Sequence, residues 1–147
     1  MPNAILVLNG PNLNLLGTRQ PEIYGTQTLK EIERHCRRME KGLDISTWWR
    51  QSNWEGQMID WIQDAQKRAA GIVINAGAYA HTSIAILDAL HAYKGPVIEV
   101  HMSRPSDRED FRHKSYVALR ADEVIEGMGA SGYEQALQNM SDLLRRP

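Results

Sequence analysis

The sequence predicts an α/β fold in which a doubly wound parallel sheet is covered by helices on both faces. Apolar runs rich in β-branched residues recur at 4–9, 71–77 and 96–102, and such short, nearly continuous runs are typical of strands buried on both faces. Between them lie segments whose apolar residues repeat at helical period. Strands that alternate with helices in this way favour a parallel sheet with crossover helices.

Two further strands complete the predicted sheet. Residues 44–51 are more mixed in polarity, so we expect this strand nearer an edge, and 117–127 should contain the fifth strand. Five strands in this β-α order predict a flavodoxin-like arrangement. In such sheets, ligands bind beyond the carboxyl ends of the strands.

Polar residues mark where the predicted helices begin. Ser83 is expected to open one helix, and Cys36 lies at core spacing in another, so we expect the thiol to pack in the interior. Three further helix starts show a Ser or Thr three residues before a Glu, which is the capping-box pattern: Thr28 with Glu31, Ser52 with Glu55, and Ser131 with Glu134.

Composition limits the classes of function. With 147 residues, 42% of them hydrophobic and 24% charged, the chain has the make-up of one globular domain spanning 1–147. A net charge of −1 gives no basic footprint for nucleic acid, and no apolar run approaches the roughly 20 residues that span a bilayer, so neither a nucleic acid nor a membrane is an expected partner. The start reads as a strand rather than a signal peptide, and one cysteine suits a reducing compartment. We therefore expect a cytoplasmic protein.

Several motifs of metal, nucleotide and serine-nucleophile chemistry are missing from the sequence. It contains no P-loop and no G-x-G-x-x-G after the first strand. It also lacks C-x-x-C, H-E-x-x-H and G-x-S-x-G. These three classes of site are accordingly disfavoured.

Chemistry-bearing residues follow three of the predicted strands. The loop "NGPNLNLLGTRQPEIYG" after the first strand contains Asn12, Arg19 and Tyr24. The third strand ends at Asn75 ahead of His81, and the fourth ends at His101 and Ser103. Because the carboxyl ends of parallel strands meet at one edge of the sheet, we expect all these residues to line one crevice.

Two pairs suggest acid–base chemistry. Glu99 and His101 are two apart on a strand and therefore share a face, where a carboxylate can orient an imidazole that acts as a general acid; a buried structural ion pair is the alternative. A phenol ordinarily titrates near pH 10, so a tyrosine base needs neighbouring cations. Arg19 is five residues from Tyr24 in the same loop; an aromatic plug that packs the loop is the ordinary interpretation of Tyr24.

Other polar residues have functional and ordinary interpretations side by side. Arg108 and Arg112 are four apart and, on a helix, could grip a carboxylate, or they could form a solvated face paired with Glu109 and Asp110. His81 could donate to a substrate oxygen or be a surface residue. Asp88, inside a predicted helix, reads as a solvated aspartate on sequence alone.

Taken together, "LNGPNLNLLGTRQPEIYG", "INAGAYAHTSIAILDAL", "PVIEVHMS", "REDFRHKSY" and "GMGASGYEQAL" resemble type II 3-dehydroquinate dehydratase in order and spacing. The resemblance covers nearly the whole chain, from about residue 4 to about residue 144. It implies the flavodoxin-like fold and the anti elimination of water from 3-dehydroquinate, giving 3-dehydroshikimate. It implies no metal, cofactor or Schiff base.

The resemblance also implies roles. The loop at about 17–26 would be a mobile lid. Tyr24 would be the base at C2 of the substrate, kept as phenolate by Arg19 and Arg108. Asn12 would place a water at the enolate oxygen. His101, oriented by Glu99, would protonate the departing hydroxyl.

The remaining implied roles concern binding and assembly. The residues expected to hold substrate hydroxyls are Asn75, His81 and Arg112. Ser103 and the backbone amide of Met102 would take the carboxylate. Asp88 would reach the site of a neighbouring subunit, because the family forms trimers grouped into dodecamers. The reaction serves aromatic biosynthesis through the shikimate route, or quinate breakdown.

This sequence departs from the family pattern in places. Trp54 stands where the family usually has His, and Arg104-Pro105 stands where it favours Asn. The latter change lies beside the expected carboxylate-binding turn and motivates the alternative of a family member with altered substrate. A non-catalytic small-molecule binder of the same fold, such as an FMN protein, is the other alternative.

Overall fold

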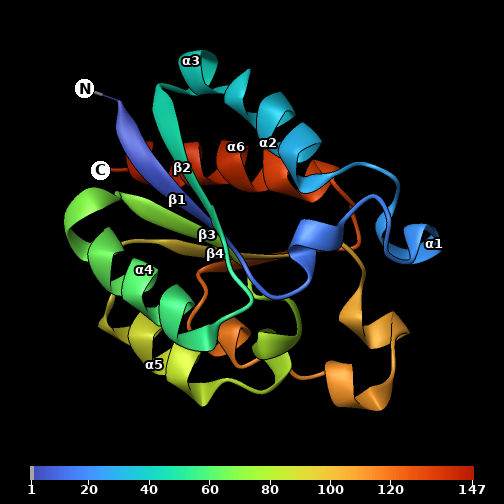
Figure 1. Ribbon diagram of the computed structural model, residues 1–147. Helices are drawn as coiled ribbons and strands as arrows, with labels where there is room; N and C mark the ends of the chain where they lie inside the picture. Colours follow the sequence, from blue (N-terminus) through green and yellow to red (C-terminus); the bar gives the residue numbers. More distant parts are fainter. Residues whose placement is uncertain (1) are drawn as a thin grey trace.

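The computed structural model describes residues 2–147 and shows a five-stranded parallel sheet in the order β2-β1-β3-β4-β5 (Figure 1). This is the flavodoxin-like order that the sequence predicts. The strands are β1 (Asn3–Asn9), β2 (Ile45–Gln51), β3 (Gly71–Asn75), β4 (Val97–His101) and β5 (Glu123–Glu126).

Helices cover both faces of this sheet. Figure 1 shows α2, α3 and α6 on one side and α4 and α5 on the other. The α-helices are α1 (Pro21–Tyr24), α2 (Leu29–Arg37), α3 (Glu40–Leu43), α4 (Glu55–Arg68), α5 (Ile84–Ala92) and α6 (Ser131–Arg145). Short 3-10 turns are η1 (Leu13–Leu15), η2 (Gly77–His81), η3 (Pro105–Asp107), η4 (Asp110–Arg112) and η5 (Val117–Leu119).

Strand polarity follows position in the sheet. The central strands β3 and β4 are buried at every residue, as their continuous apolar runs predict. The edge strand β2 alternates between buried and partly exposed residues, which confirms the expectation of an edge. The predicted fifth strand is shorter than 117–127, because 117–119 form a 3-10 turn before β5.

Two of the predicted helix caps are confirmed. Thr28 and Glu31 form the reciprocal capping box of α2, with Thr28 Oγ1 accepting from the Glu31 amide at 3.1 Å. Ser83 caps α5 by accepting from the Ile86 amide at 2.9 Å. These side chains satisfy amide groups that have no partner inside the helix.

The other two capping boxes are wrong. Trp54, not Ser52, is the N-cap of α4, and Ser52 Oγ instead accepts from the Trp54 amide at 2.9 Å. Ser131 is the first residue of α6 and its hydroxyl donates to the Met128 carbonyl at 2.7 Å. The spacing of Ser and Glu is compatible with a cap, but the preceding chain decides where the turn begins, and here it shifts each helix start.

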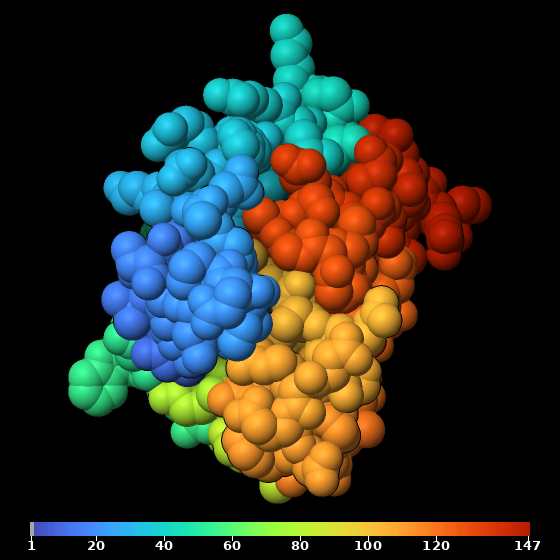
Figure 2. Space-filling model, turned by 90° about the vertical axis from the view of Figure 1, so that its right-hand side faces the viewer, coloured from blue at the N-terminus to red at the C-terminus, as the bar shows by residue number. Residues whose placement is uncertain are grey.

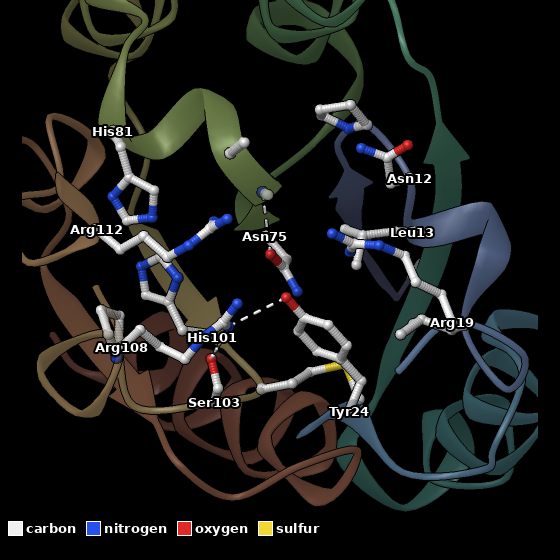
Figure 3. A pocket seen from close by; sticks show the side chains of 16 residues that line it. Asn12, Leu13, Arg19, Tyr24, Asn75, His81, His101, Ser103, Arg108 and Arg112 are labelled. Atoms are coloured by element: carbon white, nitrogen blue, oxygen red, sulfur yellow. Dashed lines mark hydrogen bonds between the residues drawn. The ribbon is translucent and has the colours of Figure 1, made fainter. Parts of the chain in front are cut away.

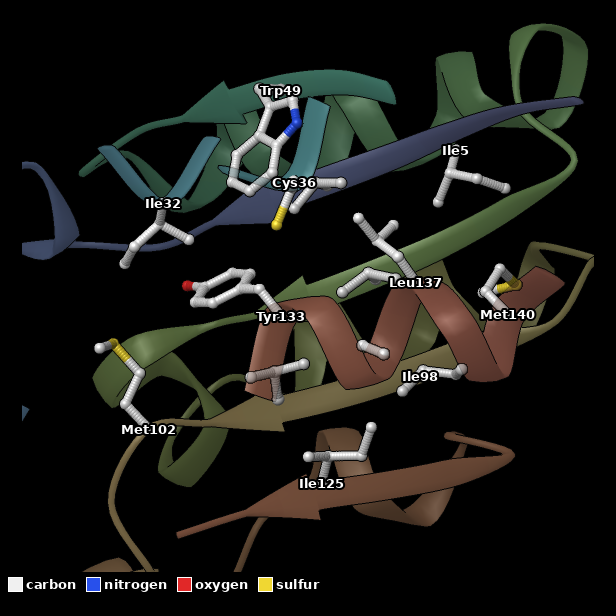
Figure 4. Close-up of a cluster of buried hydrophobic side chains, with 14 of the residues drawn as sticks. Ile5, Ile32, Cys36, Trp49, Ile98, Met102, Ile125, Tyr133, Leu137 and Met140 are labelled. Carbon is white, nitrogen blue, oxygen red and sulfur yellow. The ribbon is translucent and has the colours of Figure 1, made fainter. Parts of the chain in front are cut away.

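The interior has one apolar cluster on each side of the sheet. Figure 4 shows the cluster between the sheet and α6, in which Trp49 and Tyr133 have ring centroids 5.8 Å apart. Cys36 is fully buried there, which confirms the packing role, and burial raises the pKa of its thiol to about 12. Trp54, in contrast, is 77% exposed.

Among residues 2–147, no helix has both the length and the apolar character needed to cross a membrane.

Candidate active site

A cavity of 240 Å³ opens at the carboxyl edge of the sheet (Figure 3). Figure 2 shows the blue segment after β1 facing the orange segment after β4 across a groove. The cavity is lined by these residues that the sequence singled out: Asn12, Arg19, Tyr24, Asn75, His81, His101, Met102, Ser103, Arg108 and Arg112. Pro11, Leu13, Leu16, Gly77, Ala78 and Pro105 complete the lining.

Close packing of the loop after β1 against β3 makes this convergence possible. The Gly10 amide donates to the Asn75 carbonyl at 2.8 Å. A Cβ at Gly10 would lie 2.3 Å from the carbonyl oxygen of Ala76, so only glycine permits this approach. The next residues, which include Asn12, therefore enter the cavity beside the end of β3.

Glu99 and His101 form the buried pair expected from their spacing on β4. His101 Nε2 lies 2.6 Å from Glu99 Oε2, and the Glu99 side chain is fully buried while His101 is 8% exposed. A carboxylate accepts only, so Nε2 carries the proton of this bond. Nδ1 is then the ring nitrogen left to meet a ligand.

Ser115 is a partner of this pair that the sequence reasoning missed. Its hydroxyl donates to Glu99 Oε2 at 2.6 Å and accepts from the Ala118 amide at 3.2 Å. The Ala118 amide can only donate and the Glu99 carboxylate can only accept, so the single hydroxyl proton of Ser115 points at the carboxylate. No spacing rule links Ser115 to Glu99; only its place in "REDFRHKSY" pointed to the region.

His81 lies beside His101 with its ring nearly parallel, at an interplanar angle of 16° and a centroid distance of 6.1 Å. It ends the turn η2, and its Nδ1 lies 2.8 Å from the carbonyl oxygen of Lys114. A carbonyl only accepts, so Nδ1 is the protonated nitrogen of this ring. Nε2 of His81 is therefore free to interact with a bound molecule.

Tyr24 lies on the opposite wall, half-buried, at the end of the four-residue helix α1. Arg108 Nη1 donates to the Tyr24 hydroxyl at 3.1 Å (Figure 3). The guanidinium carbons of Arg108 and Arg19 lie 5.5 Å and 5.3 Å from the centre of the Tyr24 ring. Two cations are therefore placed to stabilise negative charge on the phenol oxygen.

Arg108 and Arg112 do not share the face of an α-helix. Arg108 lies between the turns η3 and η4 and also donates to Ser103 Oγ at 3.2 Å. Arg112 pairs with Glu109 at 3.2 Å, as the solvated-face alternative supposes, yet it lines the cavity as well. The pKa of Glu109 is held below its ordinary value, chiefly because the carboxylate accepts a hydrogen bond from the Glu109 backbone amide. The positive charges of Arg112 and Arg108 lower it further.

The remaining candidates differ in how firmly they are held. Asn75 is 4% exposed. Asn12 is exposed and has a left-handed backbone with φ 69°, and its backbone amide donates a hydrogen bond to Asn53 Oδ1 at 3.0 Å. Met102 is 5% exposed at the end of β4. Asp88 is exposed on α5 and outside the cavity lining.

The cavity is strongly cationic. Three arginines and two histidines line it, and no Asp or Glu does among the residues the structure describes. Within residues 2–147, no three His, Cys, Asp or Glu side chains gather as metal ligands would. The lining therefore suits a small anion that carries several hydroxyl or carbonyl oxygens.

Comparison with known proteins gives one consistent family. The family described as Dehydroquinase class II matches residues 3–141. A Cereibacter sphaeroides protein named 3-dehydroquinate dehydratase is 57% identical over 145 residues, which is 97% of each chain. An Agrobacterium fabrum protein named 3-dehydroquinate dehydratase 2 is 54% identical over 140 residues, covering 95% of each.

Solved structures give the same result. The type II dehydroquinase of Propionibacterium acnes superposes with a TM-score of 0.92 at 42% identity, covering 97% of this chain and 98% of that one. A 3-dehydroquinate dehydratase-like protein from Bifidobacterium longum gives a TM-score of 0.73 at 27% identity, covering 98% and 99%.

Proposed function

This chain belongs to the class II dehydroquinase family, and on that premise we propose that its cavity converts 3-dehydroquinate to 3-dehydroshikimate by anti elimination of water. Relatives more than half identical over nearly the whole chain are named for this activity, so the chain is a hydro-lyase of that kind. One observation supports the finer mechanism: a tyrosine flanked by two arginines faces a glutamate-backed histidine across one cationic cavity.

Tyr24 acts as the base in this mechanism. As phenolate it takes a proton from C2 of 3-dehydroquinate, next to the C3 ketone, and the electrons of the C–H bond move to the ketone oxygen to form an enolate. Arg108, which donates to the Tyr24 oxygen at 3.1 Å, and Arg19 beside the ring stabilise the phenolate before the transfer. Asn12 positions a water that donates to the enolate oxygen.

His101 acts as the acid. The enolate electrons return to form the C1–C2 double bond, the C1–O bond breaks, and His101 Nδ1 gives its proton to the departing hydroxyl, which leaves as water. Glu99, bonded to Nε2 at 2.6 Å, stabilises the charged imidazole that makes this donation. The proton acquired by Tyr24 returns to His101 through solvent, so each turnover restores both groups.

The other lining residues bind the substrate. Asn75, His81 and Arg112 hold its hydroxyls, while Ser103 and the Met102 amide take its carboxylate. Arg108 supports the contact between Ser103 and the substrate carboxylate, because it donates to Ser103 Oγ at 3.2 Å. The absence of Asp and Glu from the described lining removes a repulsion that the carboxylate would otherwise meet.

We further propose that residues 1–147 act as a single catalytic domain with residues 17–26 as a lid. Three residues of this segment have left-handed backbone, Gly17, Gln20 and Gly25, with φ of 94°, 43° and 83°. The backbone amides of Thr18, Arg19, Ile23, Tyr24 and Gly25 donate to carbonyls within residues 15–21, so these bonds can persist while the segment opens to admit substrate. The exposed Asp88 on α5 is available to reach a second subunit, consistent with a dodecamer of four trimers.

An ultraviolet assay tests the activity. Purified protein is mixed with 3-dehydroquinate, and the conjugated enone of 3-dehydroshikimate should raise the absorbance. Lack of turnover by the wild-type chain at high substrate would overturn the proposal. The turn at Pro105, which lines the cavity where the family pattern differs, would then be the first place to look for a changed substrate.

A further inference from the structure

A buried hydrogen-bond relay connects the cavity wall in β3, through α6, to β1 and the edge strand β2. Tyr133, in the first turn of α6, is fully buried and lies outside the cavity lining. Its hydroxyl bonds to Asn75, which lines the cavity, and to Asn9 in β1. Resting on the proposed function, we propose that Tyr133 is a positioning residue that fixes the Asn75 amide in the orientation needed to hold a substrate hydroxyl.

The direction of every bond in the relay is determined. Asn9 Nδ2 donates to the Arg50 carbonyl at 3.3 Å, which leaves Asn9 Oδ1 as an acceptor. Tyr133 gives its only hydroxyl proton to Asn9 Oδ1, 2.6 Å away. The Tyr133 oxygen must therefore accept, and it does so from Asn75 Nδ2 at 3.0 Å.

The other side of the Asn75 amide is fixed independently. The Gly77 amide donates to Asn75 Oδ1 at 3.2 Å, so the oxygen must face Gly77 and the NH₂ group must face Tyr133. A flipped amide would set two donors against each other at Gly77. With both ends held, Asn75 offers a bound molecule one further N–H and one further lone pair in a single arrangement.

Burial also keeps the relay in one protonation state. Tyr133 lies within the apolar cluster of Figure 4, and burial raises the pKa of its hydroxyl. The proton that Asn9 accepts therefore stays in place at neutral and mildly alkaline pH. The phenyl ring packs on Trp49, so removal of the hydroxyl alone leaves the packing of the cluster intact.

Tyr133→Phe removes the hydroxyl and leaves Asn75 Nδ2 without its partner. Tyr93→Phe is a matched control, because Tyr93 is 4% exposed, donates its hydroxyl to the Ala69 carbonyl at 2.8 Å and lies outside the cavity lining. We expect Tyr133→Phe to lose more stability than Tyr93→Phe, because it loses two buried hydrogen bonds and the control loses one. Only Tyr133→Phe should lower kcat/KM, by about tenfold and mainly through KM.

A double-mutant cycle with Asn75→Ala separates positioning from a general structural effect. If Tyr133 acts through Asn75, Tyr133→Phe should not lower kcat/KM any further in a chain that already carries Asn75→Ala. Additive losses in the cycle, or equal kcat/KM for Tyr133→Phe and Tyr93→Phe, would overturn the inference.

Failure of the dehydration reaction is distinguishable from failure of this inference. If the wild-type chain does not turn 3-dehydroquinate over, the proposed reaction fails. The same four-variant cycle is then measured as Kd for 3-dehydroquinate by calorimetry. Non-additive Kd values would still support positioning of Asn75, and additive or unchanged values would contradict it.

Discussion

His101 and Tyr24 meet at the same cavity from supports of different kinds. His101 ends a central strand, is 8% exposed and rests on a fully buried carboxylate that also accepts from Ser115. Tyr24 is half-buried at the end of a four-residue helix, and its only hydroxyl partner in the described structure comes from Arg108. The sheet holds the proposed acid, His101, in place, whereas the position of the proposed base, Tyr24, depends on contacts between two loops. Substitutions around Tyr24 should therefore lower activity with little loss of stability, whereas substitutions around His101 should lower both.

Tyr24→Phe should give the largest loss of activity with the smallest structural consequence. Removal of the base should lower kcat by about a thousandfold, within the range for general acid–base groups. The Tyr24 hydroxyl makes no bond within the core, so the unfolding midpoint should stay near that of wild type. Steady-state kinetics and thermal unfolding of the same preparation check both expectations. Unchanged kcat in Tyr24→Phe would show that Tyr24 serves only as an aromatic plug, because phenylalanine keeps the ring.

Arg108→Lys should come next. Arg108 donates from one nitrogen to both the Tyr24 hydroxyl and Ser103 Oγ, and lysine cannot reproduce the planar guanidinium geometry. We expect kcat/KM to fall about a hundredfold, in line with the loss of charged hydrogen bonds. Arg19→Lys is the comparison, because Arg19 only faces the Tyr24 ring at 5.3 Å, and its loss should be about tenfold. The reverse order of effects would contradict the assignment.

Ser115→Ala should have a smaller effect, because it weakens the support of the acid without removing it. We expect kcat to fall about tenfold, the cost of one hydrogen bond to a charged group. Ser83→Ala is a matched control: Ser83 also accepts from a backbone amide in a helical turn and donates to a carboxylate, that of Glu55, away from the cavity lining.

The two serine variants should lose similar stability, about 1 kcal/mol each, because each loses the hydrogen bond that its hydroxyl accepts from a backbone amide. Only Ser115→Ala should also change the pH profile of kcat, because only it touches the carboxylate that orients His101. Identical pH profiles for Ser115→Ala, Ser83→Ala and wild type would mean that Ser115 is merely a cap.

Cys36 should affect stability in alkali but not catalysis. Its pKa is about 12 in the folded chain against 9.0 for an ordinary thiol, so above pH 9 the unfolded chain loses the proton first. The unfolded state then binds fewer protons, and the free energy of unfolding falls as pH rises from 9 towards 12. Denaturant titrations from pH 7 to 10.5 should show a shallower fall for Cys36→Ala than for wild type. Equal slopes would refute the role of this thiol.

The fold could be predicted almost completely because it depends on patterns local to each segment. Continuous β-branched runs marked β1, β3 and β4, and the mixed polarity of residues 44–51 correctly indicated an edge strand. The capping boxes at Ser52 and Ser131 failed because the start of a helix depends on the path of the preceding chain. That path is a tertiary property which residue spacing does not contain.

The site was predictable where it follows strand ends and unpredictable where it depends on loops. Glu99 and His101 share a face because strand residues two apart always do. Ser115 and Tyr133 were missed because each reaches its partner only after long segments have packed together. The spacing of Arg108 and Arg112 left open whether they share the face of a helix; they do not, and the short turns η3 and η4 place both at the cavity. Asp88 lies outside the cavity of its own chain, and its role stays a prediction.

Exchange of the C2 proton tests the central claim, that Tyr24 is the base and His101 the acid, most directly. 3-Dehydroquinate is incubated in D₂O with Tyr24→Phe or with His101→Gln, and deuterium at C2 is followed by NMR. We predict that His101→Gln exchanges the C2 proton without eliminating water, because its base is intact, and that Tyr24→Phe does neither. Exchange that persists in Tyr24→Phe and disappears in His101→Gln would reverse the two roles and contradict the account.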